Sequence, residues 1–114
     1  MTIKLQELGP IQEQWLRDLE SGAYKQGIGM LENNGKYCCL GVFAYTQGGK
    51  PRKNDTGYAH LDDIDTYKLG LHSRRGQCKG GKHSLTYMND AGKTFAEIAQ
   101  FIRRNPKKVF KEVR

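Results

Sequence analysis

Near the start of the chain, apolar residues recur at three- and four-residue intervals, the spacing of a helix with one buried face. They are Ile11, Trp15, Leu16 and Leu19. Pro10 suits the first turn of a helix, and Gly22 suits the position that follows its end. The pattern predicts a helix over about residues 10–20, with the four apolar residues on one face.

A second helix of the same kind is predicted near the other end, over about residues 94–104. Its apolar face consists of Phe95, Ile98, Ala99 and Ile102. Thr94 and Glu97 have the spacing of a capping box, and Asn105-Pro106 stops the helix. We expect residues 1–106 to form one globular domain and residues 107–114 to form a basic, mobile C-terminal tail.

Between the two helices, Asn34-Gly35 separates two short apolar runs, which is a strong signal for a β-hairpin. We predict strands near 27–32 and 36–39. Gly27 and Gly29 alternate in the first strand and leave one of its faces bare, which suggests close approach of backbone or ligand. Two main helices packed on a small antiparallel sheet make the predicted fold class α+β.

Shorter elements complete the predicted fold. A helix is expected to start at Cys39 and to end before Gly48-Gly49, although a strand over 37–45 competes with it. Residues 50–56 form a polar loop, and a short helix over about 62–69 is closed by Gly70. Residues 72–83 form a basic loop with nothing to bury, 84–88 a short strand, and 89–92 a turn.

Composition fits a cytoplasmic protein of one domain. The chain has 114 residues, of which 37% are hydrophobic and 27% charged, and no apolar run approaches the length needed to span a membrane. The start shows no secretory signal peptide. Three cysteines, Cys38, Cys39 and Cys78, make a poor disulfide framework, so we expect reduced thiols.

Charge is concentrated in the second part of the chain. The net charge is +7, made up of −1 over residues 1–49 and +8 over residues 50–114. This asymmetry favours an anionic partner: a nucleic acid, a nucleotide, or the acidic face of a protein. The glycine-rich loop 72–83 resembles a phosphate cradle without matching a P-loop. The predicted anion-binding residues are Arg74, Arg75, Lys79, Lys82, Arg103 and Arg104.

Catalytic and metal-binding patterns are weak. The cysteines, together with His60, His72 and His83, lack the spacing of a structural zinc site, so no metal or cofactor is predicted. Cys38 or Cys39 with His60 or His83 and Asp90 would supply the groups of a catalytic triad, but no local signature supports one. We therefore favour a protein that is not an enzyme.

The order of motifs along residues 11–103 resembles a family of small uncharacterised proteins encoded by bacteriophages and prophages. The motifs are Trp15 and Leu19, Ser21-Gly22, Tyr24-Lys-Gln-Gly27 and Gly29, Cys38-Cys-Leu-Gly-Val42, Leu69-Gly-Leu71, Met88-Asn-Asp90, and Phe95-Ala-Glu-Ile-Ala99. Here the basic stretch 72–83 replaces the plain loop expected in that family. Beside the bare strand face, and in the family motifs, lie the residues we consider possible ligand contacts: Tyr24, Lys25, Gln26, Asn89 and Asp90.

The resemblance implies a setting, because small phage proteins of this kind are often inhibitors of host defence. The leading hypothesis is a non-enzymatic phage-type protein, in the host cytoplasm, that antagonises a host defence component by binding or mimicking the partner of a nucleic-acid or nucleotide site. One alternative is a module that binds nucleic acid directly. Another is a small nuclease or nucleotide hydrolase. The oligomeric state cannot be deduced from one sequence.

Overall fold

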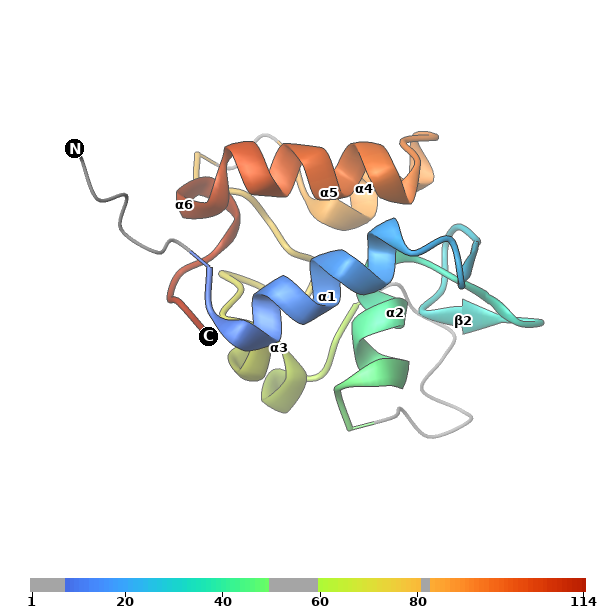
Figure 1. Ribbon diagram of the computed structural model, residues 1–114, viewed down its shortest axis with the longest axis horizontal. Coiled ribbons are helices and arrows are strands. Elements are labelled where there is room, and N and C mark those ends of the chain that lie inside the picture. Colours follow the sequence, from blue (N-terminus) through green and yellow to red (C-terminus); the bar gives the residue numbers. More distant parts are fainter. Residues whose placement is uncertain (1–7, 50–59, 81–82) are drawn as a thin grey trace.

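The protein has an α+β fold in which a small sheet lies at one end of a group of helices (Figure 1). The computed structural model describes residues 8–49, 60–80 and 83–114. The helices in these residues are α1 (Pro10–Glu20), α2 (Cys39–Thr46), α3 (Asp63–Leu69), α4 (Leu85–Asp90), α5 (Phe95–Arg104) and α6 (Pro106–Val109). The strands are β1 (Lys25–Gln26), β2 (Glu32–Asn33) and β3 (Lys36–Tyr37). The predicted fold class is confirmed, and the predicted loop at 50–56 lies outside the described residues.

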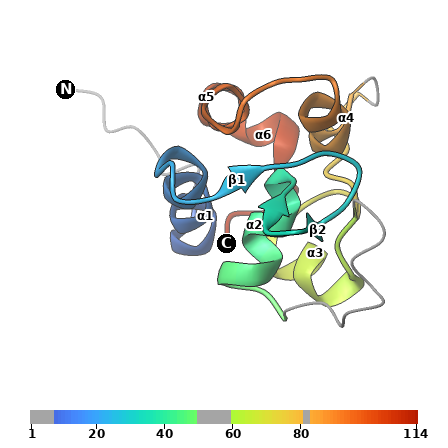
Figure 2. The same ribbon diagram turned by 90° about the vertical axis from the view of Figure 1, so that its right-hand side faces the viewer.

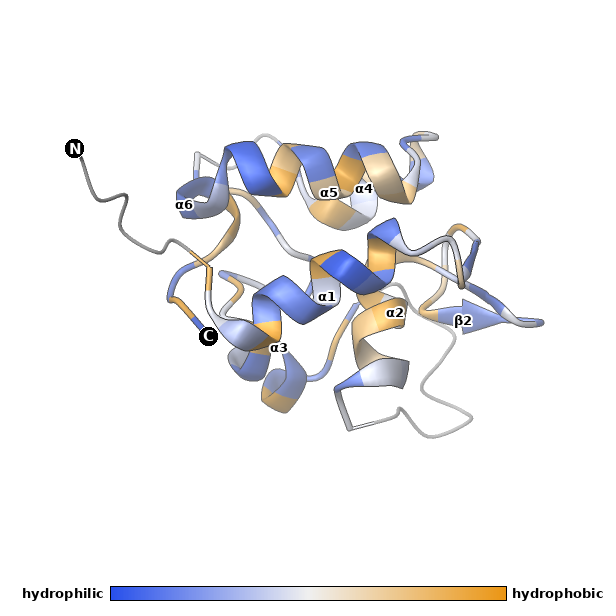
Figure 3. Cartoon of the chain, viewed as in Figure 1, coloured by the Kyte–Doolittle hydropathy of each residue, from blue (hydrophilic) through white to orange (hydrophobic). Residues whose placement is uncertain are grey.

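Helix α2 occupies the centre of the molecule, and Figure 2 shows α1 on one side of it with α3 and α4 on the other. Every residue from Cys39 to Ala44 is buried, so this helix is apolar all round. Figure 3 shows the contrast with α1 and α5, which carry a hydrophilic outer side. The predicted helix at Cys39 is therefore confirmed, and the competing strand over 37–45 is wrong.

The two long amphipathic helices are confirmed at their predicted places. Helix α5 has its capping box, and α1 begins at Pro10 and is followed by Gly22 with a positive φ of 75°. One position of the apolar face differs. Ile11 is 36% exposed, whereas the neighbouring Gln12 is fully buried. Its side-chain amide donates to the carbonyls of Leu69 and Glu112, so a polar residue holds α1 to the end of α3 and to the C-terminal segment.

The hairpin turn is confirmed, but its strands are shorter than predicted. Asn34 and Gly35 both have positive φ, 52° and 78°, as a type I′ turn requires. Only Glu32–Asn33 and Lys36–Tyr37 pair across it, so the strand predicted over 27–32 is wrong for residues 27–31.

The sheet is also mixed instead of antiparallel, because β1 lies parallel to β3 in the order β1-β3-β2. The predicted close approach of backbone occurs at Gly27, whose N–H donates to the Tyr37 carbonyl. A Cβ atom added at Gly27 would lie 2.9 Å from that of Lys36.

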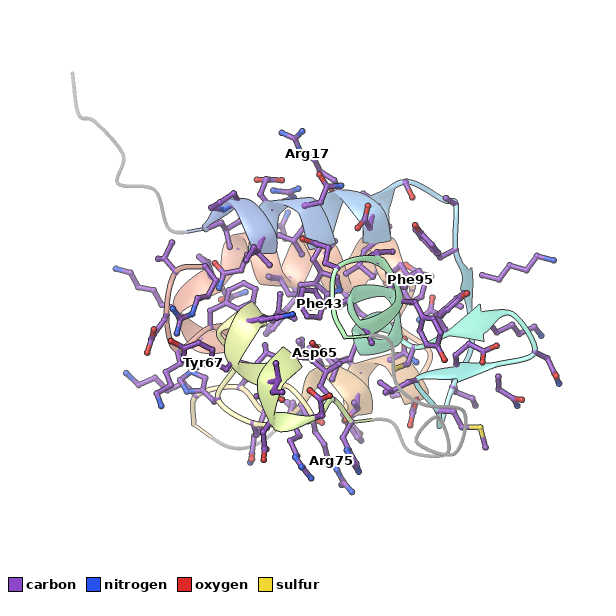
Figure 4. The ribbon with its side chains drawn as sticks, turned by 90° about the horizontal axis from the view of Figure 1, so that it is seen from below. Arg17, Phe43, Asp65, Tyr67, Arg75 and Phe95 are labelled. Atoms are coloured by element: carbon purple, nitrogen blue, oxygen red, sulfur yellow. The ribbon has the colours of Figure 1, made fainter. Side chains whose placement is uncertain are left out.

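The short helix before Gly70 is confirmed. Asp62 caps α3 by accepting from the Asp65 N–H, and Gly70 ends it in the left-handed conformation, with φ 75°. Asp65 is buried between α3 and the end of α2, where its carboxylate accepts from the Gly49 N–H (Figure 4).

Residues 85–90 form helix α4 and Ser84 is its N-cap, so the strand predicted at 84–88 and the turn predicted to start at Asn89 are wrong. The reason is a local cap: the Ser84 hydroxyl accepts from the N–H of Tyr87 and starts α4. Only Ala91 and Gly92 remain in the turn.

The C-terminal segment is packed onto the core instead of forming a mobile tail. Val109 is fully buried, and Phe110 packs edge-on against Trp15, with ring centroids 6.2 Å apart. The Arg114 carbonyl accepts from the N–H groups of Ile11 and Gln12, which closes the first turn of α1. These contacts fix the position of the basic residues between 103 and 114.

Candidate functional site

The two basic segments of the sequence meet in the fold. The N–H of Lys79, in the loop before α4, donates to the carbonyl of Lys108 in α6 at 2.7 Å. Burial raises the pKa of the Cys78 thiol, and the nearby Lys108 ammonium partly opposes this effect. Lys79, Lys107 and Lys108 are all exposed, so the hydrogen bond between Lys79 and Lys108 joins the two basic segments at the surface.

The described part of the basic loop is fixed by the core, which contradicts the expectation that it has nothing to bury. Cys78 is 9% exposed and belongs to the hydrophobic core. Gly76 is buried with a positive φ of 68°, and a Cβ atom there would lie 2.8 Å from the Leu85 side chain. The loop therefore presents its lysine and arginine side chains from a fixed backbone.

The predicted anion-binding residues of this loop fall into different environments. Arg74 binds a carboxylate of its own chain, with its Nε 2.9 Å from Asp63 Oδ1. Arg75 is exposed and points away from the body of the protein, on the opposite side from Arg17 (Figure 4). Lys79 lies beside Lys108, and Lys82 lies outside the described residues.

The predicted pair Arg103 and Arg104 is divided between two environments. Arg103 binds both Glu13 and Glu20 of α1, through hydrogen bonds of 2.6–3.0 Å. These bonds lower the pKa of both glutamates and raise that of Arg103. A partner would have to displace two carboxylates to use Arg103. Arg104 lines an open hollow of about 280 Å³ between α4 and α5, with Met88, Lys93 and Phe101.

Three of the possible ligand contacts come together, but the fold itself occupies their polar groups. Asn89 is fully buried. Its Oδ1 accepts from Gln26 Nε2 and from the Cys39 N–H, and its Nδ2 donates to the carbonyl of Gly27.

Gln26 also donates to the Lys93 carbonyl and accepts from the N–H of Phe95. The Asp90 carboxylate accepts from the N–H of Gly29. This group, which we call the Gln26–Asn89 network, joins β1, α2, α4 and the start of α5. Its arrangement indicates a structural role for residues that the sequence suggested as ligand contacts.

Tyr24 and Lys25, the other two possible ligand contacts, lie beside this network. Tyr24 packs edge-on against Tyr37, with ring centroids 5.9 Å apart. Lys25 is exposed and lies opposite Lys36 in the parallel pair of strands. An open hollow of about 310 Å³ borders the sheet and is lined by Gln26, Gly27, Ile28, Met30, Asn33 and Lys36.

The cysteines and histidines do not assemble into a reactive centre in the part of the chain that the structure describes. Cys38 and Cys39 are fully buried, and burial raises the pKa of Cys38 to about 11 and that of Cys39 as well. The Cys38 thiol accepts from the Gly41 N–H, whereas His83 stacks on Tyr87 at the surface. Within residues 8–49, 60–80 and 83–114, no three His, Cys, Asp or Glu side chains are grouped as metal ligands.

Sequence reasoning identified the basic segments but not their meeting point. A backbone hydrogen bond joins Lys79 to Lys108, which lies 29 residues later in the chain. No pattern in the sequence predicts this contact. The one available signal is the absence of acidic residues from both stretches, 71–89 and 98–111.

Comparison with known proteins identifies a family. The model of the family described as "Domain of unknown function (DUF8296)" matches residues 8–69, more than half of the chain. No curated protein matches, and neither does any solved structure. Among the described helices, none combines the length and the apolar character needed to span a membrane.

Proposed function

The chain belongs to the DUF8296 family, and we propose that it is a non-enzymatic protein that binds an anionic partner through one basic surface. This basic surface consists of Arg75, Lys79, Lys107 and Lys108. The observation that carries the proposal is the 2.7 Å hydrogen bond from Lys79 to Lys108, which brings two basic segments together at the surface.

The charge around this surface supports the proposal. Residues 71–89 and 98–111 contain no aspartate or glutamate, although the protein as a whole has twelve acidic residues. Cations gathered from stretches that contain no acidic residue create a positive potential that attracts anions and raises their local concentration. The acidic residues Glu13 and Glu20 belong instead to α1, where Arg103 binds them.

The biological setting follows from the resemblance to small bacteriophage proteins. In that setting, the protein would act in the host cytoplasm as an antagonist of a defence component. It would bind the nucleic acid or nucleotide that this component recognises, or mimic that partner. The basic surface supports binding over mimicry, because a cationic face attracts the phosphates of the partner.

The proposal is tested by binding three anions at two salt concentrations: a fluorescent single-stranded oligonucleotide, inorganic polyphosphate and an acidic peptide. The test variant is the double substitution Lys79→Ala/Lys108→Ala. The matched control is Lys25→Ala/Lys36→Ala, which removes two exposed lysines that face each other on the sheet.

We expect the test variant to bind more weakly and with a smaller salt dependence. For a single strand, loss of two phosphate contacts reduces the slope of log K against log salt by about 1.4. The control should bind as the wild type does. The proposal fails if no anion binds, or if both variants lose affinity equally.

A further inference from the structure

Two aromatic rings stack on each other at the surface beside the basic residues. The ring centroids of His83 and Tyr87 are 5.4 Å apart, and the ring planes differ by 21°. His83 is exposed, and 58% of Tyr87 is exposed. Tyr87 lies on the outer side of α4, away from Leu85 and Thr86, which are buried. The stacked pair therefore leaves flat aromatic surface in contact with water.

Backbone pairing places this stacked pair next to the basic surface. Residues 75–78 run antiparallel to residues 83–86: Gln77 pairs with Ser84, and the N–H of Cys78 donates to the His83 carbonyl at 2.9 Å. At the far end of the pairing, the N–H of Thr86 donates to the Arg75 carbonyl at 3.3 Å. The backbone of Arg75 thus lies beside that of Thr86, the residue before Tyr87, and the backbone of Cys78, the residue before Lys79, lies beside that of His83.

Aromatic rings beside cations are the two components of a surface that binds nucleotides. A base stacks on a flat ring because both faces are apolar and polarisable, while lysine and arginine neutralise the phosphates. In a duplex, each base already stacks on its neighbours inside the helix. Only a free nucleotide or an unpaired strand offers a base face to the rings.

We propose that the anionic partner is a nucleotide, free or within a single strand, whose base stacks on the His83–Tyr87 pair. Lys79 and Arg75 contact its phosphates. This inference rests on the proposed function, because it identifies the chemical class of the anion that the basic surface binds.

The test compares ligands that differ only in their bases. An oligothymidylate strand and an abasic strand of equal length carry the same phosphates, and a mononucleotide panel distinguishes a free nucleotide from a strand. The variants are Tyr87→Ala, Tyr87→Phe and Tyr67→Ala. Tyr67 is a matched control because 66% of it is exposed, and its ring contacts the Arg114 guanidinium instead of a basic-surface residue.

We expect Tyr87→Ala to weaken binding of the base-containing ligand roughly fivefold to a hundredfold, the range of one stacking contact. Tyr87→Phe and Tyr67→Ala should bind normally, and the abasic strand should not respond to any of the three variants. Strong binding of one mononucleotide with little effect of salt would identify the free nucleotide as the source.

Other outcomes overturn the inference separately from the proposed function. If the abasic strand binds as tightly as oligothymidylate, stacking plays no part, but the basic surface still binds phosphates. If only the acidic peptide binds, the partner is a protein and the nucleotide assignment is wrong. If Tyr87→Ala and Tyr67→Ala lose affinity equally, the effect does not come from the stacked pair.

Discussion

Replacing Asn89 with alanine is expected to destabilise the fold strongly, because this one side chain joins three elements. Its amide accepts from the N–H of Cys39 at 3.2 Å and from Gln26 at 2.9 Å, and donates to the Gly27 carbonyl at 2.8 Å. Cys39 is the first residue of α2, so its N–H has no carbonyl within the helix to bind. Alanine leaves that N–H buried without an acceptor.

The expected loss follows from these three bonds. A buried N–H left unsatisfied costs about 1–3 kcal/mol, and each further lost hydrogen bond contributes about 1 kcal/mol. The loss is smaller at Gly27, because its carbonyl group is on a residue partly exposed to water. It is also smaller at Gln26, because the Gln26 side chain keeps its hydrogen bond to the Lys93 carbonyl. We expect a total of about 3 kcal/mol, a large fraction of the 5–15 kcal/mol that stabilises an ordinary domain.

Urea unfolding followed by tryptophan fluorescence measures this loss. Trp15 is the only tryptophan in the chain, is fully buried, and donates to the Cys39 carbonyl at 2.9 Å, so it reports on the region that Asn89 anchors. Gln14→Ala is the control, since its amide makes an exposed hydrogen bond to Asp18 on α1. That control should change the free energy of unfolding by less than about 0.5 kcal/mol.

A loss below about 1 kcal/mol for Asn89→Ala, or one equal to that of Gln14→Ala, would refute the reasoning. The Gln26–Asn89 network would then contribute little to stability. Asn89 and Gln26 would regain the role that the sequence suggested, as contacts for a ligand at the edge of the sheet.

Two further perturbations test the electrostatics and the cysteines. Arg103→Ala should cost no more than about 1 kcal/mol at neutral pH because the ion pairs are at the surface. Since Arg103 lowers the pKa of Glu13 and Glu20, this stabilisation is complete above the ordinary glutamate pKa and is lost as the pH falls through the lowered values. Urea unfolding from pH 7 to about pH 2 measures this pH dependence for the wild type, Arg103→Ala and the control Arg104→Ala. If the difference in the free energy of unfolding between wild type and Arg103→Ala persists in acid, the reasoning is wrong. In the native protein, a thiol reagent at about pH 8 should modify Cys78 before Cys38. The Cys38 side chain is fully buried, and its pKa of about 11 leaves roughly 0.1% of it as thiolate at that pH. Mass spectrometry of the labelled peptides locates the modification, and rapid labelling of Cys38 in folded protein would contradict the burial described here.

Local signals in the sequence predicted the elements whose formation depends on neighbouring residues. The capping box of Thr94 and Glu97, the stop at Gly70 and the Asn34-Gly35 turn all act within a few residues, and each is present in the structure. Local propensity failed at residues 84–88, where Tyr87 and Thr86 suit a strand but the Ser84 cap begins a helix. It also failed for the C-terminal tail, because Phe110 finds a packing partner in Trp15, far away in the sequence.

For the candidate site, the sequence by itself determined which residues carry charge and amide groups, and only the tertiary structure decided what those groups do. Gln26 and Asn89 were expected to contact a ligand, but these two residues, 63 positions apart in the sequence, bind each other in the structure. Arg103 faces two carboxylates of α1, while Lys79 lies beside Lys108. The physical reason is that charge and polarity belong to a residue, whereas the availability of a polar group depends on which partners the fold brings within hydrogen-bonding distance.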